Sequence, residues 1–543
     1  MKKTIIITAL TLILAASAVL LTAAFGDDDP GLYKIYYDGK STGFFGYFDK
    51  NTPYLPVGMI GKYASNPGIT VDTSNLRLEI DISAMNIMMA DDDVTNFVKT
   101  YAGNAYIPLR KIEDDVYFPL NTTQQFFRLN YSVSGGSINI AAYSGTDKIA
   151  VVQGGGASAL TSIIAGRGET VPLSTNERVI VTGETDNYYV INISDKGKAY
   201  VLKDCLSILD EGAASLDFYA PKKVKWKQGG PKINLAWQYV ADVTPEAPSK
   251  YGGLDIISPT WFDLITDGDG AVENNGDKGY MDQCRDSGYM VWATITNSMS
   301  TKGSTKFTTK VFNTQALLNK SIAQYIFYAC LYDVDGINID YEDVDDNDAP
   351  GLVNFTRALR DYTERQGLVL SIDTLIPKPW TIEYDRKNLA RYVDYIAVMT
   401  YDEHWSTSPQ AGSVSSLPWS EQAIKDTISE GVPADKILLG VPLYTRVWCI
   451  GANGRIVSSK SATMQFVQDL LAEKNLTPTY LSYEQQNYVE YPDGDTTAKI
   501  WIEDNVSIQN RINLVKKYNL AGTACWQFAQ GTEDIWSVFE QSL

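Results

Sequence analysis

The sequence predicts an α/β protein whose C-terminal half is a barrel of eight parallel strands, preceded by small, mostly β accessory domains. A strand-like run at 336–341 lies between two helix-like runs, 314–332 and 351–365. A strand flanked by helices on both sides is normally buried in a parallel sheet. From about residue 232 such runs alternate, with eight strand candidates at 233–240, 254–258, 289–296, 336–341, 368–373, 395–401, 437–443 and 522–527. Eight is the number that closes a (β/α)8 TIM barrel.

Length and composition limit the possible functions. A chain of 543 residues suggests about three domains. The net charge of −19 argues against binding to a phosphate backbone, so we expect no nucleic acid partner. The five cysteines contain no C-x-x-C pair and are most simply core residues, and no ligand spacing supports a zinc site with His404. We expect no cofactor, no metal and a monomer.

The N-terminal segment 1–26 reads as a signal peptide or a membrane anchor. Lys2 and Lys3 precede an uncharged apolar run, 4–25, which is long enough to span a bilayer. The small residues 16–18, which could form a cleavage site, lie inside this run, which favours an uncleaved anchor. We therefore expect the rest of the chain to be extracellular or at the cell surface, with membrane contact only through this segment.

Two accessory modules are expected next. The region 31–145 contains short strands, a helical segment at 122–129 and a hairpin at 130–142 that turns at Gly135-Gly136. It resembles the copper amine oxidase N-terminal module, a stalk-like domain without copper chemistry. A Gly/Ser-rich linker is expected at 146–165. A β module at 166–210 follows, with strands at 178–182, 188–193 and 198–202, and it resembles a small bacterial SH3-like barrel. Such a module binds wall peptides or serves as a spacer.

The strand at 336–341 is the centre of the predicted active site. In an extended strand Asn338, Asp340 and Glu342 point to one face, and the apolar residues between them point to the other. The two carboxyl groups are then about 6–7 Å apart, near the spacing that serves hydrolysis of a glycosidic bond. The alternative is an edge strand with a solvated acidic face, but the flanking helices disfavour it, since a buried acidic face is costly unless it lines a pocket.

The eight residues 335–342, DGINIDYE, resemble the D-G-x-D-x-D-x-E motif of family 18 glycoside hydrolases, the chitinases and N-acetylglucosaminidases. Asn338 replaces the second Asp of that motif, as in the branch that includes spore-cortex and cell-wall peptidoglycan glucosaminidases. The resemblance covers 230–543, in which a long segment at 447–503 matches the α+β insertion between strands 7 and 8. The insertion is expected to contain a helix at 463–474 and strands at 486–491 and 499–503.

The resemblance implies substrate-assisted retaining catalysis on N-acetylglucosamine-containing glycan. Glu342, nearest the mouth of its strand, would be the general acid, which needs a raised pKa. Asp340 would orient the N–H of the sugar's 2-acetamido group, whose carbonyl oxygen attacks the anomeric carbon. Tyr401 would hydrogen-bond the acetamido oxygen, Asp402 would contact the substrate, and Trp526 would form the floor of the sugar subsite.

The other predicted strand ends carry aromatic and polar residues that suit a carbohydrate cleft. We predict substrate contacts for Asn338, Asp402, Met399, Trp526, Trp237, Tyr444 and Arg446, and expect Trp261 on the same rim. Barrel-core packing is the alternative for each aromatic side chain. We also expect the Asn338 amide to donate a hydrogen bond to Asp340. Three functions stay open: a surface-anchored peptidoglycan hydrolase, a chitinase, and a non-catalytic carbohydrate-binding protein on the same barrel.

Overall fold

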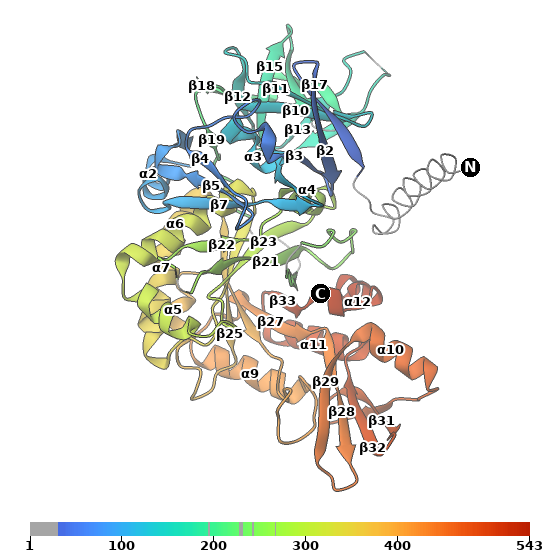
Figure 1. Cartoon of the computed structure of the whole chain (residues 1–543). Helices are drawn as coiled ribbons and strands as arrows, with labels where there is room; N and C mark the ends of the chain where they lie inside the picture. Colours follow the sequence, from blue (N-terminus) through green and yellow to red (C-terminus); the bar gives the residue numbers. More distant parts are fainter. Residues whose placement is uncertain (1–30, 165, 194–195, 227–231, 242–243, 267) are drawn as a thin grey trace, which may run out of the picture.

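The computed structural model describes residues 31–164, 166–193, 196–226, 232–241, 244–266 and 268–543 (Figure 1). The predicted signal or anchor segment at 1–26 lies outside these residues. Within the described part of the chain, none of the helices is both long and apolar enough to cross a membrane.

The C-terminal half is the predicted (β/α)8 barrel. Its eight strands are parallel, in the order β20-β21-β23-β24-β25-β26-β27-β33, and β33 pairs with β20 to close the ring. They are β20 (Ile233–Gln238), β21 (Ile256–Leu264), β23 (Met290–Thr296), β24 (Gly336–Asp340), β25 (Val369–Leu375), β26 (Tyr395–Met399), β27 (Ile437–Pro442) and β33 (Gly522–Trp526). A short strand, β22 (Val272–Asn274), pairs antiparallel with β21. The fold class is confirmed, and each strand lies at a predicted position.

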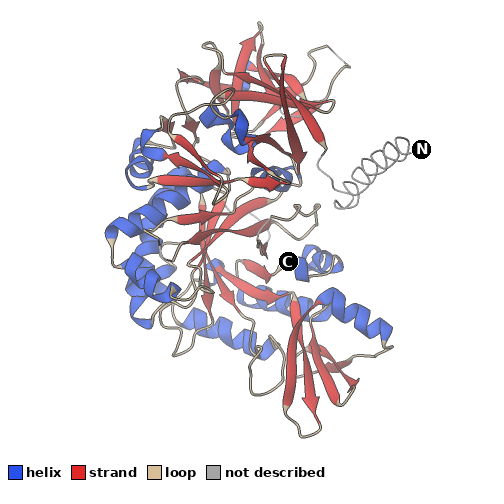
Figure 2. Ribbon diagram, in the orientation of Figure 1, coloured by secondary structure: helices blue, strands red, loops and turns tan. Residues whose placement is uncertain are grey.

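Helices cover the outside of the barrel (Figure 2). They are α4 (Lys278–Asp286), α5 (Ser304–Phe312), α6 (Gln315–Leu331), α7 (Ala349–Gln366), α8 (Arg386–Leu389), α9 (Leu417–Ser429), α11 (Asn505–Tyr518) and α12 (Asp534–Ser542). The predicted helices on either side of β24 are α6 and α7. Helix α7 begins with a proline in its first turn and ends at Gly367 with φ 81°, a left-handed conformation that glycine adopts without a Cβ clash.

An insertion leaves the barrel after β27, as predicted. It is a five-stranded sheet in the order β29-β28-β32-β31-β30, with helix α10 (Met464–Glu473) packed on it. The strands are β28 (Tyr444–Gly451), β29 (Ile456–Thr463), β30 (Thr479–Leu481), β31 (Gln486–Asp493) and β32 (Thr496–Ile502). The sheet begins at Tyr444, three residues before the predicted start, because β28 directly follows the last residues of β27.

The N-terminal module contains two sheets and two helices. The larger sheet has the order β10-β11-β1-β2-β3-β9-β8 and the smaller one β4-β5-β7. The elements are β1 (Leu32–Tyr37), β2 (Lys40–Asp49), β3 (Thr52–Pro56), β4 (Ile69–Asp72), β5 (Arg77–Asp81), β6 (Ile87–Met88), α2 (Asp92–Tyr101), β7 (Asn104–Pro108), β8 (Arg110–Ile112), β9 (Asp115–Pro119), α3 (Leu120–Phe127), β10 (Leu129–Ser134) and β11 (Ser137–Ala142). The predicted hairpin is the antiparallel pair β10–β11.

The second module is larger than expected. Its seven-stranded sheet has the order β14-β13-β17-β16-β15-β12-β18. The strands are β12 (Lys148–Val152), β13 (Ala157–Leu160), β14 (Thr170–Leu173), β15 (Arg178–Glu184), β16 (Tyr188–Ile193), β17 (Gly197–Leu202) and β18 (Leu206–Gly212), and a short β19 (Phe218–Tyr219) pairs with β6. The linker predicted at 146–165 is therefore wrong for most of its length. Its apolar residues Ile149, Ala150, Val152 and Ala159 are buried, so β12 and β13 belong to the sheet.

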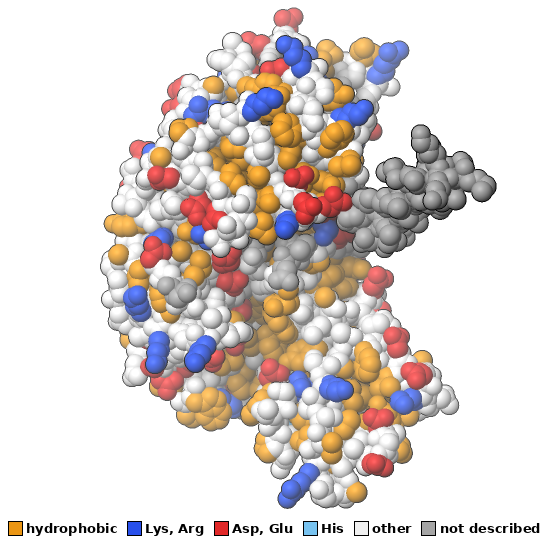
Figure 3. Space-filling view, viewed as in Figure 1, with side chains coloured by type: hydrophobic (Ala, Val, Ile, Leu, Met, Phe, Trp, Pro, Cys, Tyr) orange, Lys and Arg blue, Asp and Glu red, His pale blue; other side chains and the backbone are white. Residues whose placement is uncertain are grey.

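The accessory modules and the barrel share buried contacts. Phe327 on α6 contacts Phe126 of α3 and Phe218 of β19. The ring of Phe97 on α2 stacks on Tyr362 of α7 with centroids 3.9 Å apart. The expected stalk-like role therefore does not fit the packing, because one apolar core runs from the N-terminal module into the barrel. In Figure 3 the chain curves around a hollow, with hydrophobic side chains along its inner side.

Candidate active site

Strand β24 divides its side chains between the barrel interior and the helices, as predicted. Ile337 and Ile339 belong to the apolar core, and the Tyr341 ring stacks on Phe355 of α7 with centroids 5.0 Å apart. Asn338 hydrogen-bonds side chains of β20, β23 and β25, which places it inside the barrel. Because side chains alternate along a strand, Asp340 and Glu342 share that face.

Glu342 lies two residues beyond the end of β24, where the sheet no longer satisfies its backbone. Asn297 replaces the sheet: its Nδ2 donates to the Glu342 carbonyl at 2.7 Å, and its Oδ1 accepts from the Glu342 N–H at 3.2 Å. Thr308 of α5 accepts a further hydrogen bond from Asn297 Nδ2 at 3.1 Å. The half-buried carboxyl group is thus attached to a fixed backbone.

The environment of Glu342 suits a proton donor at neutral pH. Burial raises the pKa of its carboxyl group to about 7, and the negative charges of Asp343 and Asp402 act in the same direction. A general acid is most effective when its pKa lies near the working pH. Glu342 therefore has the protonation behaviour expected of the predicted acid.

Asp340 is buried below Glu342, 9% exposed, and its Oδ1 has no hydrogen-bond partner among the described residues. Burial raises the pKa of Asp340 well above the usual range, and the negative charges of Glu342, Asp373 and Asp263 raise it further. An unpaired acceptor is costly in a closed interior. A buried carboxyl oxygen without a partner can accept a hydrogen bond from a donor group of a bound substrate.

Asn338 does not make the hydrogen bond that the sequence suggested. Its Nδ2 donates to Asp373 Oδ1 at 2.8 Å and to Ser371 Oγ at 3.0 Å, both on β25, and not to Asp340. Its Oδ1 accepts from Trp237 Nε1 at 2.9 Å. Only 1% of the surface of Asn338 is exposed, so the side chain is buried inside the barrel, which does not fit the predicted substrate contact. The error arises because the neighbouring strand supplies a closer carboxyl group than its own strand does.

Three predicted residues meet where β26 ends and the insertion begins. Burial raises the pKa of Tyr401 well above its usual value, and Asp373, Asp340 and Glu342 add to this shift, which indicates that the hydroxyl lies near these carboxyl groups. Tyr444 of β28 donates to Asp402 Oδ1 at 2.5 Å. Its ring meets that of Tyr401 edge-on, with centroids 6.4 Å apart. Tyr401 and Asp402 are therefore beside Glu342, and Tyr444 orients Asp402.

The predicted tryptophans differ in their accessibility. Trp526, at the end of β33, is partly exposed and contacts Trp237 with ring centroids 6.1 Å apart. Trp237 is only 2% exposed, so it supports Asn338 and Trp526 from below and is not the sugar contact predicted for it. Trp261 is not on the rim either, because it is buried against Tyr280 and Tyr332 on the outside of the barrel.

The remaining two predicted contacts lie at the margin of the site. Met399 is the buried last residue of β26. Arg446 is held within the insertion sheet, where its Nε donates to Ser459 Oγ at 2.7 Å and its guanidinium group lies over the Trp448 ring. The sugar contacts expected for Met399 and Arg446 stay predictions.

The structure brings three further residues to this site: Asn297, Asp373 and Asp263. The sequence places the first two at predicted strand ends, on the expected polar rim, but gives them no role. Asp263 was missed because β21 is longer than its predicted strand and continues to Leu264. Thr296 and Asn275 hydrogen-bond Asp263, and burial raises the pKa of its carboxyl group.

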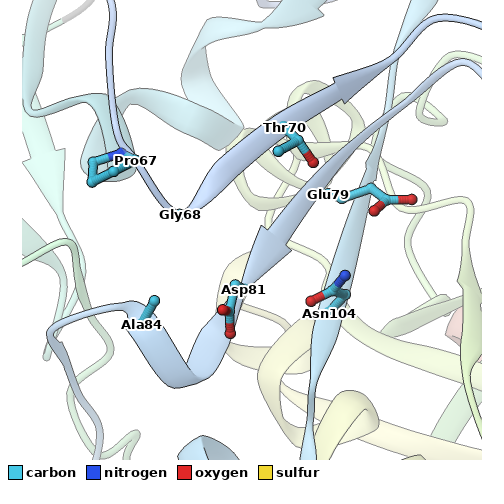
Figure 4. A pocket seen from close by; sticks show the side chains of 7 residues that line it. All are labelled: Pro67, Gly68, Thr70, Glu79, Asp81, Ala84 and Asn104. Carbon is cyan, nitrogen blue, oxygen red and sulfur yellow. The ribbon is translucent and has the colours of Figure 1, made fainter.

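Two hollows lie elsewhere in the described part of the chain. A pocket of about 340 Å³ on the sheet of β4, β5 and β7 contains Glu79 and Asp81 (Figure 4). Arg77 pairs with Glu79, and Ser83 hydrogen-bonds Asp81, so both carboxyl groups are used. A cavity of about 890 Å³ lies between the second module and the residues that precede β24 and β25. Among the described residues no group of three or more His, Cys, Asp or Glu side chains is placed to hold a metal ion.

The acidic pair stands at the end of the fourth strand of a closed parallel barrel, where active sites of such barrels lie, and a pair of carboxyl groups can serve hydrolysis of a glycosidic bond. Comparison with known proteins agrees, since residues 281–531 match the family model "Glycosyl hydrolases family 18". Residues 281–531 are therefore similar to this family of glycosidases. The copper amine oxidase and SH3-like resemblances of the accessory modules have no such support.

Relatives with curated descriptions cover this region. "Putative sporulation-specific glycosylase YdhD" of Bacillus subtilis (strain 168) is 30% identical over 245 residues, which are 44% of this chain and 57% of that protein. The cortical fragment-lytic enzyme of the same organism is 26% identical over 42% of this chain and 54% of its own length. The chain thus spans little more than half the length of these relatives.

A solved structure supports the same fold. The spore cortex-lytic enzyme SleL of Bacillus megaterium QM B1551 superposes with a TM-score of 0.51 at 16% identity. The match covers 65% of this chain and 78% of that structure.

Proposed function

We propose that this protein cleaves β-1,4 bonds of an N-acetylglucosamine-containing glycan, namely peptidoglycan, by substrate-assisted retaining catalysis. One observation carries the proposal. Glu342, half-buried and with a pKa of about 7, stands at the mouth of β24 above the buried Asp340. This pair combines a proton donor that is ready near neutral pH with a carboxyl oxygen, Asp340 Oδ1, that has no hydrogen-bond partner within the described part of the chain.

The residues divide the reaction as follows. The Glu342 carboxyl group donates its proton to the glycosidic oxygen, and the bond between this oxygen and the anomeric carbon breaks. The acetamido carbonyl oxygen of the same sugar forms the new bond to the anomeric carbon. Asp340 accepts a hydrogen bond from the acetamido N–H and stabilises the positive charge that develops. Tyr401 donates a hydrogen bond to the acetamido oxygen. Water then opens the ring intermediate and returns a proton to Glu342.

The choice of peptidoglycan rests on the relatives and on Asn338. A cortical fragment-lytic enzyme is among the curated relatives, and Asn338 stands where the chitinase motif has Asp. Chitin is the second candidate, favoured by a 31% identity over 131 residues with Endochitinase 1 of Metarhizium robertsii. That match covers 20% of this chain and 31% of the relative.

The deciding experiment is mass analysis of the products formed from purified peptidoglycan and from chitin oligomers. We expect products with a free N-acetylglucosamine reducing end from peptidoglycan and slower release from chitin. A thiazoline mimic of the cyclic intermediate should inhibit competitively, because its fused ring copies the shape of that intermediate. Sugar binding without cleavage of either substrate would mean that the barrel is a carbohydrate-binding protein. A covalent glycosyl adduct on Asp340 would exclude the assisted mechanism.

We also propose that the protein acts outside the cell. This rests on Lys2 and Lys3 and the apolar run that follows them. Protease added to intact cells should release the barrel, and N-terminal sequencing of the native protein should show whether segment 1–26 is retained. Protection of the barrel in intact cells would contradict this location.

A further inference from the structure

Asp373 lies beside Asp340 on the neighbouring strand. The parallel register of β24 and β25 pairs Asn338 with Ser371 and Ile339 with Ile372. One further step along both strands brings Asp340 opposite Asp373. Neighbouring strands are about 4.8 Å apart, so two carboxyl groups on the same face at this register are close neighbours.

Two buried carboxyl groups at this distance do not both ionise easily, and the usual solution is a single shared proton. Asp340 is 9% exposed and Asp373 1%. Burial and nearby carboxylates raise the pKa of both groups, Asp340 through Glu342, Asp373 and Asp263, and Asp373 through Glu342. Two further titratable groups lie near these carboxyl groups: the hydroxyl of Tyr401, which follows β26, and the hydroxyl of Tyr384, whose pKa is raised by burial and by the charges of Glu342 and Asp340.

The hydrogen bonds show which partner carries the charge. Asn338 Nδ2 donates to Asp373 Oδ1 at 2.8 Å, and Trp237 also favours the ionised form of Asp373. Asp340 Oδ1 has no donor among the described residues. A carboxylate is favoured by donors, and a neutral acid tolerates their absence better. In the free protein the charge therefore belongs on Asp373 and the proton on Asp340.

We propose that Asp340 and Asp373 form a pair shared between two strands, and that its proton moves from Asp340 to Asp373 when the substrate's acetamido N–H reaches Asp340. The proposal rests on the function proposed above and adds a residue to it. In the step, the Asp340 O–H bond breaks and an Asp373 O–H bond forms, so the charge moves to Asp340 and no further reactant is needed. Asn338 cannot titrate, so β25 supplies the second acid that the family motif has on β24.

The pH dependence of Asp373→Asn tests this exchange. In the wild type, the acidic limb of the rate profile should report the lower of the two pKa values of the pair, because the singly protonated pair is the active form. In Asp373→Asn the limb should instead report Asp340 itself, and it should move to higher pH by about one unit or more. If Asp373 were only a fixed negative charge beside Asp340, its removal would move the limb to lower pH. A limb that moves down or stays in place overturns the proposal.

Two more variants complete the test. The double variant Asn338→Asp with Asp373→Asn returns the second acid to β24, and its acidic limb should move back toward the wild-type position. Asp255→Asn removes a carboxyl group that accepts from the Asn234 backbone at the opposite end of the barrel. The acidic and alkaline limbs of the pH–rate profile of Asp255→Asn should match those of the wild type.

A titration of the free protein separates this inference from the proposed function. Aspartate labelled with ¹³C at the carboxyl carbon allows each group to be followed by NMR as the pH is changed. The signal lost in Asp340→Asn should titrate at the higher pH of the two, and the signal lost in Asp373→Asn at the lower pH. The reverse order overturns the assignment of the proton, even if no glycan is cleaved. If the order is as expected but no glycan is cleaved, the proposed function fails and the pair stands.

Discussion

Glu342 is the residue on which the chemistry depends most directly. Its pKa of about 7 means that the protonated form, which the donor step needs, is lost as the pH rises through neutrality. We expect the alkaline limb of kcat/KM near pH 7. Glu342→Gln should keep the fold and lower kcat by about 10²–10⁴-fold, since it removes the proton and preserves the shape. Near-normal turnover in this variant would show that another group is the acid.

Asn297 should matter through Glu342. Asn297→Ala removes both hydrogen bonds to the Glu342 backbone, and we expect kcat to fall by about 10–100-fold with little change in KM, because small displacements of a catalytic group are costly. Steady-state kinetics and a melting curve measure the two effects.

Asn234 provides the matched control. It is an equally buried amide at the opposite end of the barrel, donating to the Gly253 carbonyl at 2.7 Å and accepting from Thr523. Asn234→Ala should cost a similar amount of stability, about 1–3 kcal/mol, with kcat unchanged. Equal losses of kcat in both variants would mean that Asn297 is important only for folding.

The insertion is attached to the barrel by a buried ion pair. Arg511 of α11 donates to Glu503 through two nitrogens, at 2.7 and 2.9 Å, and to the Ser415 carbonyl at 2.6 Å. Gln486 of β31 adds a hydrogen bond to the same carboxylate. The pair therefore links the insertion sheet, the β26–α9 loop and α11.

Arg511→Met should lower the free energy of unfolding by about 3–5 kcal/mol, because it leaves the Glu503 carboxylate buried without its cation. Denaturant unfolding measures the change. Lys517 is on α11, like Arg511, but it is exposed, and it pairs with Glu421 of α9. Lys517→Met should therefore leave the unfolding curve almost unchanged. Similar unfolding curves for the two variants would contradict a structural role of the buried pair.

The molecule as a whole folds around a core that the modules and the barrel share. Gln324 of α6 donates to the Ala102 and Asn104 carbonyls, and Asn274 of β22 donates to the Tyr106 carbonyl. A barrel made alone would leave these groups and the Phe327 ring in water. The N-terminal module therefore acts as part of the barrel's support.

A chain that begins at Lys232 should consequently melt at lower temperature than the full protein, or aggregate. Phe327→Ala in the full protein should cost about 3–5 kcal/mol, as expected for a large buried ring, and calorimetry should still show the barrel and the module unfolding together. An isolated barrel with the melting temperature of the full protein would show that the modules are independent.

Local patterns were sufficient for much of this protein. Alternation along β24 and the apolar runs of α6 and α7 follow from the residues themselves, so the eight strands, the insertion and the acidic face of Glu342 and Asp340 could be predicted. The partners of those residues could not. Asn338 turns to Asp373, Asn297 holds Glu342, and β12 joins a sheet where a linker was expected. These contacts join residues that are distant in the sequence, and only closure of the barrel and of its neighbouring sheets brings them within hydrogen-bonding reach.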